Sequence, residues 1–370
     1  MTKLEKMIQE ICPNGVKTVE LIEVCDITKG IQFNKADMND QGSYPVINGG
    51  IGPSGYIEQY NQDSNKITIS QGGASAGFVN WITTKFWAGA HCYVLIPKDT
   101  VLNRYLYHFI KSKEYKLQEC QYGAGIPALA KSTVEKLYIP IPPLAVQREI
   151  VRILDNFTEL TTELTTELTA RRKQYEYYRD ALLTASDNIE YQTLPEISEN
   201  LDRQRKPVTK GNREAGEYPY YGASGIVDYV SDYIFDGDYL LVSEDGANLL
   251  ARSTPIAFSI SGKNWVNNHA HVLKFDTAIM QKYVEIYLNS IDLSKYISGG
   301  AQPKLNQDNL NKIPIPVPPF NKVKIIVAIL EKFSALCNDL TSGLPAEIEA
   351  RKKQYEYYRD KLLTFQEAKI

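Results

Sequence analysis

The sequence is poor in the residues from which metal and redox sites are built. Its 370 residues include only four histidines and five cysteines. The cysteines stand alone at Cys12, Cys25, Cys92, Cys120 and Cys337, whereas metal sites and disulfide frameworks use closely spaced cysteines. We therefore expect reduced, mostly buried thiols and no metal site in this chain.

Long hydrophobic runs are also missing. No stretch of about 18 apolar residues could cross a bilayer, and the first residues lack the basic and then apolar layout of a secretory signal. The hydrophobic content of 43% is that of a globular protein, and 370 residues suffice for two domains of ordinary size. We expect a cytoplasmic protein with no membrane partner.

An excess of positive charge is absent as well. The chain has 41 basic and 44 acidic residues, a formal net charge of −3, and a pI near 5.9. Non-specific affinity for DNA comes mainly from cations that neutralise phosphates. A chain of this composition can act on DNA only if its basic residues are concentrated locally or if partner subunits supply most of the affinity.

Several catalytic motifs are missing too. The run from Gly72 to Gly77 matches neither GxxxxGK[ST] nor a complete GxGxxG. The nearest string to the Asn/Asp-Pro-Pro-Tyr/Phe tetrad of amino methyltransferases is Val317 to Phe320, which lacks the first polar residue. We find no helicase ATP site, no carboxylate–lysine nuclease core and no nucleophile elbow. We expect no catalytic residue and no cofactor in this chain.

What the sequence does contain is an internal duplication. The segment RRKQYEYYRDALLT from Arg171 recurs as RKKQYEYYRDKLLT from Arg351. The segments upstream of these repeats, here called heads, share only short landmarks. A constant frame with two divergent heads indicates that the frame docks one partner twice while each head reads something different. The landmarks, in the same order in both halves, are Tyr44-Pro45 and Tyr218-Pro219, Gly73 and Gly246, AHCYVL at His91 and NHAHVL at His269, GAGIPAL from Gly123 and GGAQPKL from Gly299, and the proline ladders ending at Pro143 and Pro319.

After each proline ladder, apolar and aromatic residues recur at spacings of three and four, which is typical of a coiled-coil seam. This pattern predicts two helices of about 40 residues, each about 60 Å long. We expect them to pair antiparallel and to hold the heads at opposite ends. Ordinary helix packing is the plain interpretation of such stripes, so we assign the helices the roles of spacer and docking surface. The seam comprises Ile150, Ile153, Phe157, Leu160, Leu164, Leu168, Tyr175, Tyr178 and Leu182, and then Ile326, Ile329, Phe333, Leu336, Leu340, Leu344, Ile348, Tyr355, Tyr358 and Leu362.

Two local features interrupt this periodicity. Residues Thr158 to Thr169 are three tandem copies of Thr-Glu-Leu-Thr, a period of four that departs from the heptad and unwinds the supercoil. In the second helix, Gly343-Leu344-Pro345 predicts an extra turn and a kink or restart, since proline is tolerated in a first helical turn.

The heads carry β-type signals such as KITIS, HCYVLIP, DYLLVS and HVLKF between turn residues, with short helical stretches from Leu102 and Gln281. The predicted fold class is α+β: two mixed α/β heads joined by two long antiparallel coiled-coil helices, with an internal pseudo-twofold repeat. The expected domains are a first head at 1–143, a central spacer helix at 144–185, a second head at 186–319 and a C-terminal spacer helix at 320–370.

Both heads contain residues suited to contact DNA. In the second head Arg203, Arg205, Lys206, Lys210 and Arg213 cluster with few acids, so they form either a phosphate-contacting patch or a merely solvated loop. Thinner candidates in the first head are Lys29, Lys85 and Lys131.

Candidates for closer contacts lie near the landmarks. Gly72, Gly73 and Ser75 belong to a tight turn that permits close approach of the backbone, by DNA or by another group. His91 and His269 occupy equivalent places, although histidines in a core or turn are the commoner case. Side chains with donors and acceptors suited to base edges are Asn80, Asn248, Arg252, His271, Gln302 and Lys304.

The sequence resembles the specificity subunit of type I restriction-modification systems in four features. These are the duplicated proline ladder, the long helices, the tandem Thr-Glu-Leu-Thr units and the string GLPAEIEARKKQYEYYRDKLLTF near the end. The resemblance spans the full chain and is most specific in the helices. It implies two target-recognition domains, each reading one half of an interrupted asymmetric DNA site. It also implies that the helices space the domains and bind two modification subunits. The implied docking surface comprises Arg171, Lys173, Tyr175, Tyr178, Arg179, Arg351, Lys353, Tyr355, Tyr358 and Arg359.

In this family the partner subunits carry the chemistry. The resemblance implies S-adenosylmethionine in the modification subunits, and ATP and Mg²⁺ in restriction subunits that translocate and cleave DNA. This chain would then be a non-catalytic recognition subunit with double-stranded DNA as its ligand. Two alternatives remain open: a coiled-coil adaptor whose two heads bind proteins rather than DNA, and an enzyme that combines cofactor binding and DNA reading.

Overall fold

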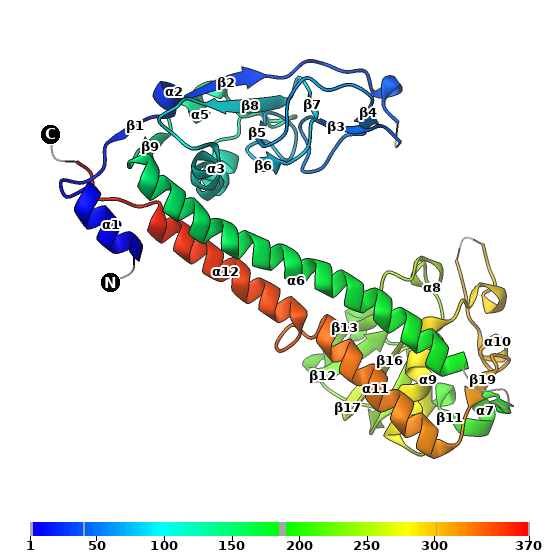
Figure 1. The fold of residues 1–370 in the computed structure, drawn as a ribbon. Coiled ribbons are helices and arrows are strands. Elements are labelled where there is room, and N and C mark those ends of the chain that lie inside the picture. The colour runs from blue at the N-terminus through cyan, green and yellow to red at the C-terminus, as the bar shows by residue number, and fades with distance from the viewer. Residues whose placement is uncertain (1–2, 40, 185–189, 301, 369–370) are drawn as a thin grey trace. The chain divides into compact units, whose positions relative to one another are not determined.

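The computed structural model describes residues 3–39, 41–184, 190–300 and 302–368 and divides into two compact units (Figure 1). The first unit is Met1–Thr165 with Glu347–Ile370, and the second is Thr166–Ala346. Each unit therefore contains one head with part of the long helices. Among the described residues, no helix combines the length and apolar character needed to cross a membrane.

The first unit is a mixed helix-and-sheet structure. Its core sheet has the antiparallel order β2-β8-β5-β6, and a smaller sheet has the order β4-β3-β7. The elements are α1 (Lys3–Ile11), β1 (Thr18–Glu20), α2 (Leu21–Val24), β2 (Cys25–Lys29), β3 (Tyr44–Ile47), β4 (Tyr56–Ile57), β5 (Lys66–Ser70), β6 (Val79–Ile82), β7 (Trp87–Ala88), β8 (Cys92–Pro97), α3 (Asn103–Ser112), α4 (Glu114–Glu119), α5 (Lys131–Glu135), β9 (Tyr138–Pro140) and the first part of α6 (Leu144–Thr184), with a short 3₁₀ turn at Lys35–Asp37.

The core of the first head lies between the larger sheet and α3. Consecutive residues of β5 and β8 are buried, from Ile67 to Ser70 and from Cys92 to Leu95. Because successive strand side chains point to opposite faces, both faces of these two strands are covered. The hydroxyl of Tyr105 on α3 is also buried and donates to the carbonyl of Pro140 at 3.0 Å. This bond ties the head to the proline ladder from which α6 begins.

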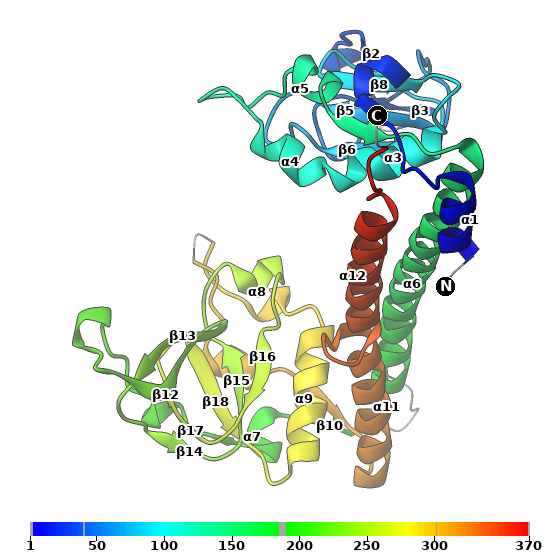
Figure 2. The same ribbon diagram turned by 90° about the vertical axis from the view of Figure 1, so that its left-hand side faces the viewer.

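In the first unit α6 runs antiparallel to α12 (Leu344–Leu362) (Figure 1 and Figure 2). Phe157 of α6 stacks on Tyr358 of α12 with ring centroids 5.4 Å apart. Helix α1 packs beside them, with Lys3 3.4 Å from Glu149. The backbone of Val16 pairs in parallel with that of Glu367, so the first unit joins segments from near both ends of the chain.

The second unit repeats this plan. Its sheets have the orders β11-β18-β15-β16 and β13-β12-β17-β14. The elements are the rest of α6, β10 (Glu190–Gln192), α7 (Leu194–Ile197), β11 (Glu199–Asn200), β12 (Ala215–Gly222), β13 (Gly225–Val230), β14 (Phe235–Asp236), β15 (Tyr239–Ser243), α8 (Asn248–Ala251), β16 (Ala257–Ile260), β17 (Lys263–Val266), β18 (Ala270–Lys274), α9 (Ala278–Ser290), α10 (Gln307–Leu310), β19 (Ile315–Val317), α11 (Phe320–Asn338) and the start of α12, with 3₁₀ turns at Asp202–Gln204, Lys210–Asn212 and Ser294–Tyr296.

The duplication is visible in matching contacts. Tyr283 of α9 donates to the carbonyl of Pro316 at 2.8 Å, as Tyr105 does to Pro140 in the first unit. Tyr178 of α6 packs against Phe333 of α11, as Tyr358 does against Phe157. The structure confirms the α+β fold with an internal repeat. It also confirms the strands expected from KITIS, HCYVLIP, DYLLVS and HVLKF and the helices expected from Leu102 and Gln281.

The second helix of about 40 residues, predicted with a kink or restart, is divided into two helices. Helix α6 has 41 residues, but its counterpart is two helices of 19 residues each, α11 and α12. The side chain of Asp339 accepts from the backbone nitrogen of Thr341 at 2.7 Å, in the turn after α11. A Cβ at Gly343 would lie 2.6 Å from the carbonyl oxygen of Ala335. The restart predicted at Gly343-Leu344-Pro345 is confirmed.

The predicted seam is correct for most of its residues in α6 and α12, where Tyr178 and Tyr358 are exposed, and only partly correct in α11. Ile326 is buried as expected, yet Ile329 and Leu336 are exposed, as is Leu340 in the turn after α11. The residues buried in their place are Val323, Val327, Leu330 and Cys337. The reason is that α11 packs against the head helix α9 as well as against α6, where Phe333 meets Tyr178. The buried face of α11 is therefore rotated away from a simple two-helix seam.

Candidate nucleic-acid interface

In the first head, the turn after β5 meets the start of β8 and the segment 122–128. We call this region the first rim: Gln71, Gly72, Gly73, His91 and 122–128. The backbone nitrogen of Gly73 donates to Pro127 at 2.8 Å, and Nδ1 of the exposed His91 lies 3.3 Å from Oε1 of Gln71. Gly73 has a φ of +82°, a conformation that other residues rarely adopt.

The second head builds the same feature from different side chains. We call this the second rim: Glu244, Asp245, Gly246, His269 and the described residues of 298–304. The backbone nitrogen of Gly246 donates to Pro303 at 3.1 Å, and Nδ1 of His269 lies 2.8 Å from Oδ2 of Asp245. The main-chain construction is therefore shared, whereas the partner of the exposed histidine changes from a neutral amide to a carboxylate.

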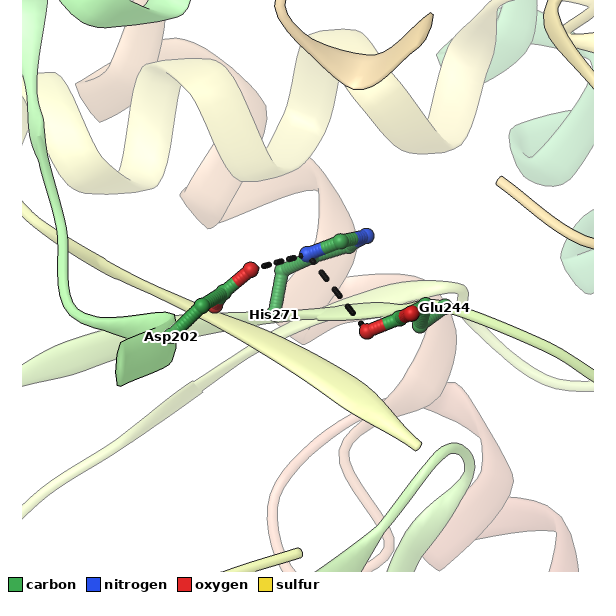
Figure 3. Close-up of side chains that lie close together, drawn as sticks. All are labelled: Asp202, Glu244 and His271. Atoms are coloured by element: carbon green, nitrogen blue, oxygen red, sulfur yellow. Dashed lines mark hydrogen bonds and ion pairs between the residues drawn. The ribbon is translucent and has the colours of Figure 1, made fainter. Parts of the chain in front are cut away.

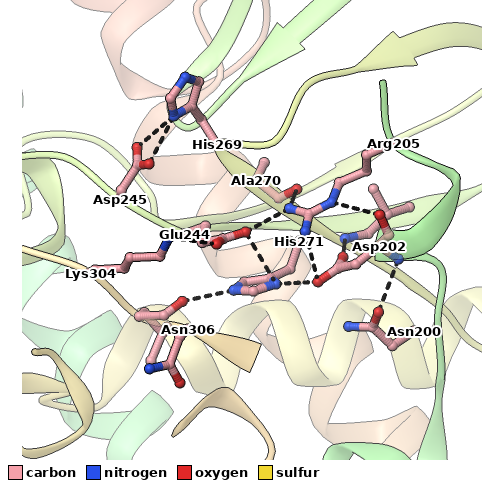
Figure 4. A network of polar contacts seen from close by, with 12 residues as sticks. Asn200, Asp202, Arg205, Glu244, Asp245, His269, Ala270, His271, Lys304 and Asn306 are labelled. Atoms are coloured by element: carbon pink, nitrogen blue, oxygen red, sulfur yellow. Dashed lines mark hydrogen bonds and ion pairs between the residues drawn. The ribbon is translucent and has the colours of Figure 1, made fainter. Parts of the chain in front are cut away.

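A buried polar network lies beneath the second rim (Figure 3 and Figure 4). Nδ1 of His271 is 2.5 Å from Oδ2 of Asp202, and Nε2 donates to the carbonyl of Leu305 at 2.8 Å. Arg205 donates to Glu244 at 2.7 Å and lies 3.2 Å from Asp202. In the first head, Tyr93 occupies the place of His271 and donates to the carbonyl of Leu129, so the charged network belongs to the second head alone among the described residues.

The two carboxylates of this network are held ionised. Burial raises the pKa of Asp202, but its hydrogen bond with His271 and the charge of Arg205 outweigh burial, and the pKa lies below its usual value. Burial likewise opposes ionisation of Glu244, while Arg205, His271 and Lys304 together lower its pKa. Opposite charges within a few ångströms favour the ionised form.

Asp202, Glu244 and His271 lie close enough together to be compared with a metal site. However, the guanidinium of Arg205 and the ammonium of Lys304, 3.1 Å from Oε1 of Glu244, already bind these carboxylates. A divalent cation would have to displace both cations, so the residues fit an ion-pair network rather than a metal centre.

The interpretation of His271 as a base-reading residue requires correction. Its side chain is 1% exposed and both ring nitrogens have protein partners. Two arginines of the predicted phosphate patch also form ion pairs with carboxylates of their own head. Arg205 belongs to the buried network, and Arg213 pairs with Asp228 at 3.1 Å and lies over the ring of Tyr220. Arg203, Lys206 and Lys210 are exposed and stay candidates for phosphate contact.

Apart from Gln302 and Lys304, the other candidates do not gather at the rims. Asn248 accepts from the backbone of Thr254 at 3.0 Å. Arg252 donates to the carbonyl of Ile291 at 2.8 Å. Lys85 contacts Tyr60. Of the remaining candidates, Lys29 ends β2, Asn80 lies in β6, Ser75 lies in the turn between β5 and β6, Lys131 pairs with Glu135 at the start of α5, and Gln302 and Lys304 lie exposed in the second rim.

The chain matches the family described as type I restriction modification DNA specificity domain twice, over residues 13–171 and 186–350. It is 32% identical to a putative type I restriction enzyme specificity subunit from Haemophilus influenzae, over 98% of each chain. It is 31% identical to the EcoR124I/EcoR124II specificity subunit from Escherichia coli, over 99% of this chain and 97% of that one.

The chain belongs to the type I restriction-modification specificity subunits. The fold agrees with this assignment. The crystal structure of an S subunit from Mycoplasma genitalium superimposes with a TM-score of 0.62 and 20% identity, covering 95% of this chain and 96% of that one. In this chain, the two heads of the duplicated sequence share the backbone construction of the rim and differ in the side chains that the rim carries.

The helix segment that the resemblance implies for docking is only partly exposed in this member of the family. Lys173, Tyr178, Lys353 and Tyr358 are exposed. Tyr175 and Tyr355 are instead packed against the cores of their units. Arg171 and Arg351 bond neighbours one turn away on their own helices, and Arg179 and Arg359 bond the next residue. The two copies have nearly the same burial pattern, as expected for a repeated surface.

Sequence analysis missed several residues that shape the rims. Oδ1 of Asn48 accepts from the backbone nitrogen of His91 at 2.9 Å, and Asp245 orients His269. The exposed tip of 122–128 carries Ile126, which is 78% exposed. The repeated GAGIPAL and GGAQPKL landmarks were the available signal, because a loop kept in both heads points to a shared construction.

Proposed function

We propose that this chain selects the DNA sequence on which a type I restriction-modification complex acts. Each head reads one part of an interrupted two-part target, the helices set the distance between the parts, and two modification subunits bind the helices. S-adenosylmethionine chemistry then takes place in the modification subunits, and ATP- and Mg²⁺-dependent cleavage in restriction subunits. This chain contributes no catalytic group.

The observation that carries this proposal is the pair of rims. Both are built from the same backbone bonds, of a glycine with a positive φ to a proline carbonyl, and both place a histidine at the surface. His91 lies beside an amide and His269 beside a carboxylate. Amides and carboxylates pair with different base edges. Two rims with the same backbone and different polar side chains therefore suit a target with two different parts.

The division of labour also accounts for the net charge of −3. In the second head, Arg205 and Arg213 are neutralised by carboxylates of the same head, which leaves Arg203, Lys206 and Lys210 to meet phosphates. Phosphate contacts dominate affinity, whereas base contacts provide specificity. Most of the affinity for DNA therefore comes from the modification subunits.

Mapping methylated adenines tests the proposal directly. DNA from cells that express this chain with its modification subunit should be methylated at one interrupted target with two different parts. Replacing residues 1–143 by the head of another family member should change one part and leave the other. Methylation at a single uninterrupted sequence, or a change in both parts after a one-head exchange, would contradict the proposal.

A further inference from the structure

Each head carries the same group of side chains on its smaller sheet. In the first head, Tyr44 of β3 packs against Tyr60 with ring centroids 5.0 Å apart, and Nζ of Lys85 lies 4.2 Å from the centre of the Tyr60 ring. The same Nζ donates to the hydroxyl of Tyr60 at 2.8 Å. We call Tyr44, Tyr60 and Lys85 the first lysine–tyrosine cluster.

The second head repeats this cluster residue by residue. Tyr218 of β12 packs against Tyr233 with ring centroids 5.1 Å apart, and Nζ of Lys263 lies 4.6 Å from the centre of the Tyr233 ring. The strand register supports the correspondence, because β3 is parallel to β7 and β12 to β17, with Trp87 and Trp265 at equivalent places. We call Tyr218, Tyr233 and Lys263 the second lysine–tyrosine cluster.

The clusters are alike although the core beside them differs between the heads. Asn264 takes the place of Phe86, and Tyr220 takes the place of Val46, and all four side chains are at most 1% exposed. Close-packed interiors are sensitive to changes of even one methylene, whereas an exposed contact between a cation and a ring contributes only modestly to stability. A surface group that stays constant over a changing core indicates a role outside the head.

The polar atoms of the clusters are open to a ligand. Tyr60 is 43% exposed and the side chain of Lys85 is 44% exposed, and Lys263 is exposed as well. An ammonium group only donates, so the oxygen of Tyr60 accepts from Lys85 and the hydroxyl hydrogen is left for another acceptor. Asp63 lies 3.8 Å from Lys85 but is 75% exposed, and an ion pair of this kind is weak. The cluster therefore offers ammonium and hydroxyl donors to an anion.

Each cluster also lies close in the chain to the rim of its own head. Lys85 precedes His91 by six residues, and Lys263 precedes His269 by six residues. Six residues of extended chain span at most about 20 Å, which is less than one turn of the DNA double helix, about 34 Å. A duplex that meets a rim can therefore meet the cluster of the same head within the same part of the target.

The sugar–phosphate backbone is the part of a DNA target that does not change with sequence. Lysine and tyrosine side chains are among the usual donors to phosphate oxygens. We propose that each lysine–tyrosine cluster binds a backbone phosphate of the duplex beside the bases that its head reads. This proposal rests on the proposed function and extends it. The rims differ and select the sequence, whereas the clusters are alike and fix the position of the duplex against each head.

The test uses the complex of this chain with its modification subunits, and two DNA duplexes, one with the mapped target and one with both parts scrambled. The variants are Lys85→Gln, Lys263→Gln and the two together, and Tyr60→Phe removes one hydroxyl. Lys113→Gln is the matched control, because Lys113 lies 5.4 Å from the centre of the Phe109 ring in a pair that the second head does not repeat. Circular dichroism and native mass spectrometry verify the fold and the composition of each complex.

Each lysine variant should weaken binding to both duplexes alike, by about threefold to tenfold at roughly 0.15 M salt, and should lower the slope of log K against log salt by about one. Tyr60→Phe should weaken binding to both duplexes without changing the slope. Lys113→Gln should bind as the wild type does. The methylated sequence should be the same in every variant, and a changed sequence would overturn the proposal because the cluster would then read bases.

Methylphosphonate substitution, which neutralises one phosphate at a time, locates the contact. One neutral phosphate in or beside the first part of the target should weaken binding of the wild type and of Lys113→Gln but not weaken Lys85→Gln further. Lys263→Gln should behave in the same way at a phosphate of the second part. Additive losses at every phosphate would overturn the proposal, as would unchanged affinity and slope in the double variant.

Two further outcomes separate this proposal from its alternatives. Loss of a modification subunit from the complexes of the lysine variants would assign the clusters to a protein partner and overturn the phosphate contact. A wild-type complex that binds the two duplexes equally would overturn the proposed function, and this proposal with it.

Discussion

The hydroxyl of Tyr355 on α12 lies 2.9 Å from Nδ1 of His108 on α3. The other ring nitrogen, Nε2, lies 2.9 Å from Oδ1 of Asp155 on α6. Since a carboxylate only accepts, Nε2 carries the hydrogen and Nδ1 accepts from Tyr355. A single imidazole, 0% exposed, therefore joins the first head to both helices of its unit. Ile286 takes its place in the second unit, where it lines an open groove.

This arrangement predicts acid sensitivity in the first unit. Burial lowers the pKa of His108, although its hydrogen bond with Asp155 opposes the shift. The unfolded chain, with a histidine pKa of about 6.5, takes up the proton first, so stability is complete above this pH and is lost as pH falls below it. Hydrogen exchange in α3 and α12, corrected for intrinsic rates, should show less protection at about pH 5.5 than at about pH 7.5. His108→Gln should reduce this difference, and constant protection in the wild type would contradict the prediction.

The bond itself can be tested by removing one hydroxyl. Tyr355→Phe leaves the buried Nδ1 of His108 without its donor and should lower the free energy of unfolding of the first unit by about 1–3 kcal/mol. Tyr175→Phe is the matched control, because Tyr175 occupies the repeated position but lines the groove. Its effect should stay within about 0.5 kcal/mol. Equal effects on urea denaturation would show that the contact with His108 contributes little.

The buried network beneath the second rim predicts a local cost for removing one carboxylate. Glu244→Gln leaves Lys304 without its carboxylate and leaves Arg205 with Asp202 alone, and should destabilise the second head by about 2–4 kcal/mol. The comparison is Glu349→Gln, at an exposed pair with Lys353, which should cost about 0.5 kcal/mol or less. Hydrogen exchange should report the destabilisation in β15 and β18 and leave β5 and β8 unchanged. Destabilisation of both heads would be inconsistent with a local network.

The same network gives a second acid-sensitive range, lower than that of His108. The pKa values of Asp202 and Glu244 are lowered in the folded chain. Their contribution to stability is therefore complete above the unfolded values of about 4 and is lost as pH falls through the lower, folded values. Glu244→Gln should make the unfolding free energy of the second head less dependent on pH below about 4.

Exposed lysines of the second head should affect affinity rather than specificity. Lys206→Ala/Lys210→Ala should weaken binding of the complex to all DNA sequences alike, and reduce the slope of log K against log salt by about 1 for each phosphate that these lysines neutralise. Lys274→Ala, at another exposed lysine of this head, is the control. A change in the methylated sequence would mean that these lysines read bases.

The Thr-Glu-Leu-Thr units should set the spacing of the target, on the proposed function. Thr161 and Thr165 bond the carbonyls of Phe157 and Thr161 at 2.8 Å and 2.7 Å, and α6 continues unbroken through the units. Adding or removing one unit changes the helix by about 6 Å, or one or two base pairs at about 3.4 Å each. Methylation mapping should show the two parts moved by that amount, and an unchanged spacing would refute the idea.

The sequence predicted features that depend on local pattern. The duplication, the 41-residue α6 and the restart at Gly343 all follow from repeats, periodicity and glycine–proline signals. Contacts between residues far apart in the chain did not follow. His271 was assigned to base reading because its side chain has suitable donors and acceptors. Its burial was not predicted because it depends on contacts with Asp202 and Leu305, 69 and 34 residues away. The exposure of Ile329 could not be predicted either, since periodicity does not tell which helix or head an apolar stripe meets.

The backbone pairing of Val16 with Glu367 has a consequence for synthesis on the ribosome. The second unit is one continuous stretch, Thr166–Ala346, whereas the first needs Glu347–Ile370 to supply α12. The first unit is synthesised first, but its packing is completed only when the last residues have been made. Until then His108 lacks its contact with Tyr355, and Phe157 lacks its contact with Tyr358. Translation that stops shortly before residue 347 would release a chain whose second unit can fold and whose first unit cannot be completed.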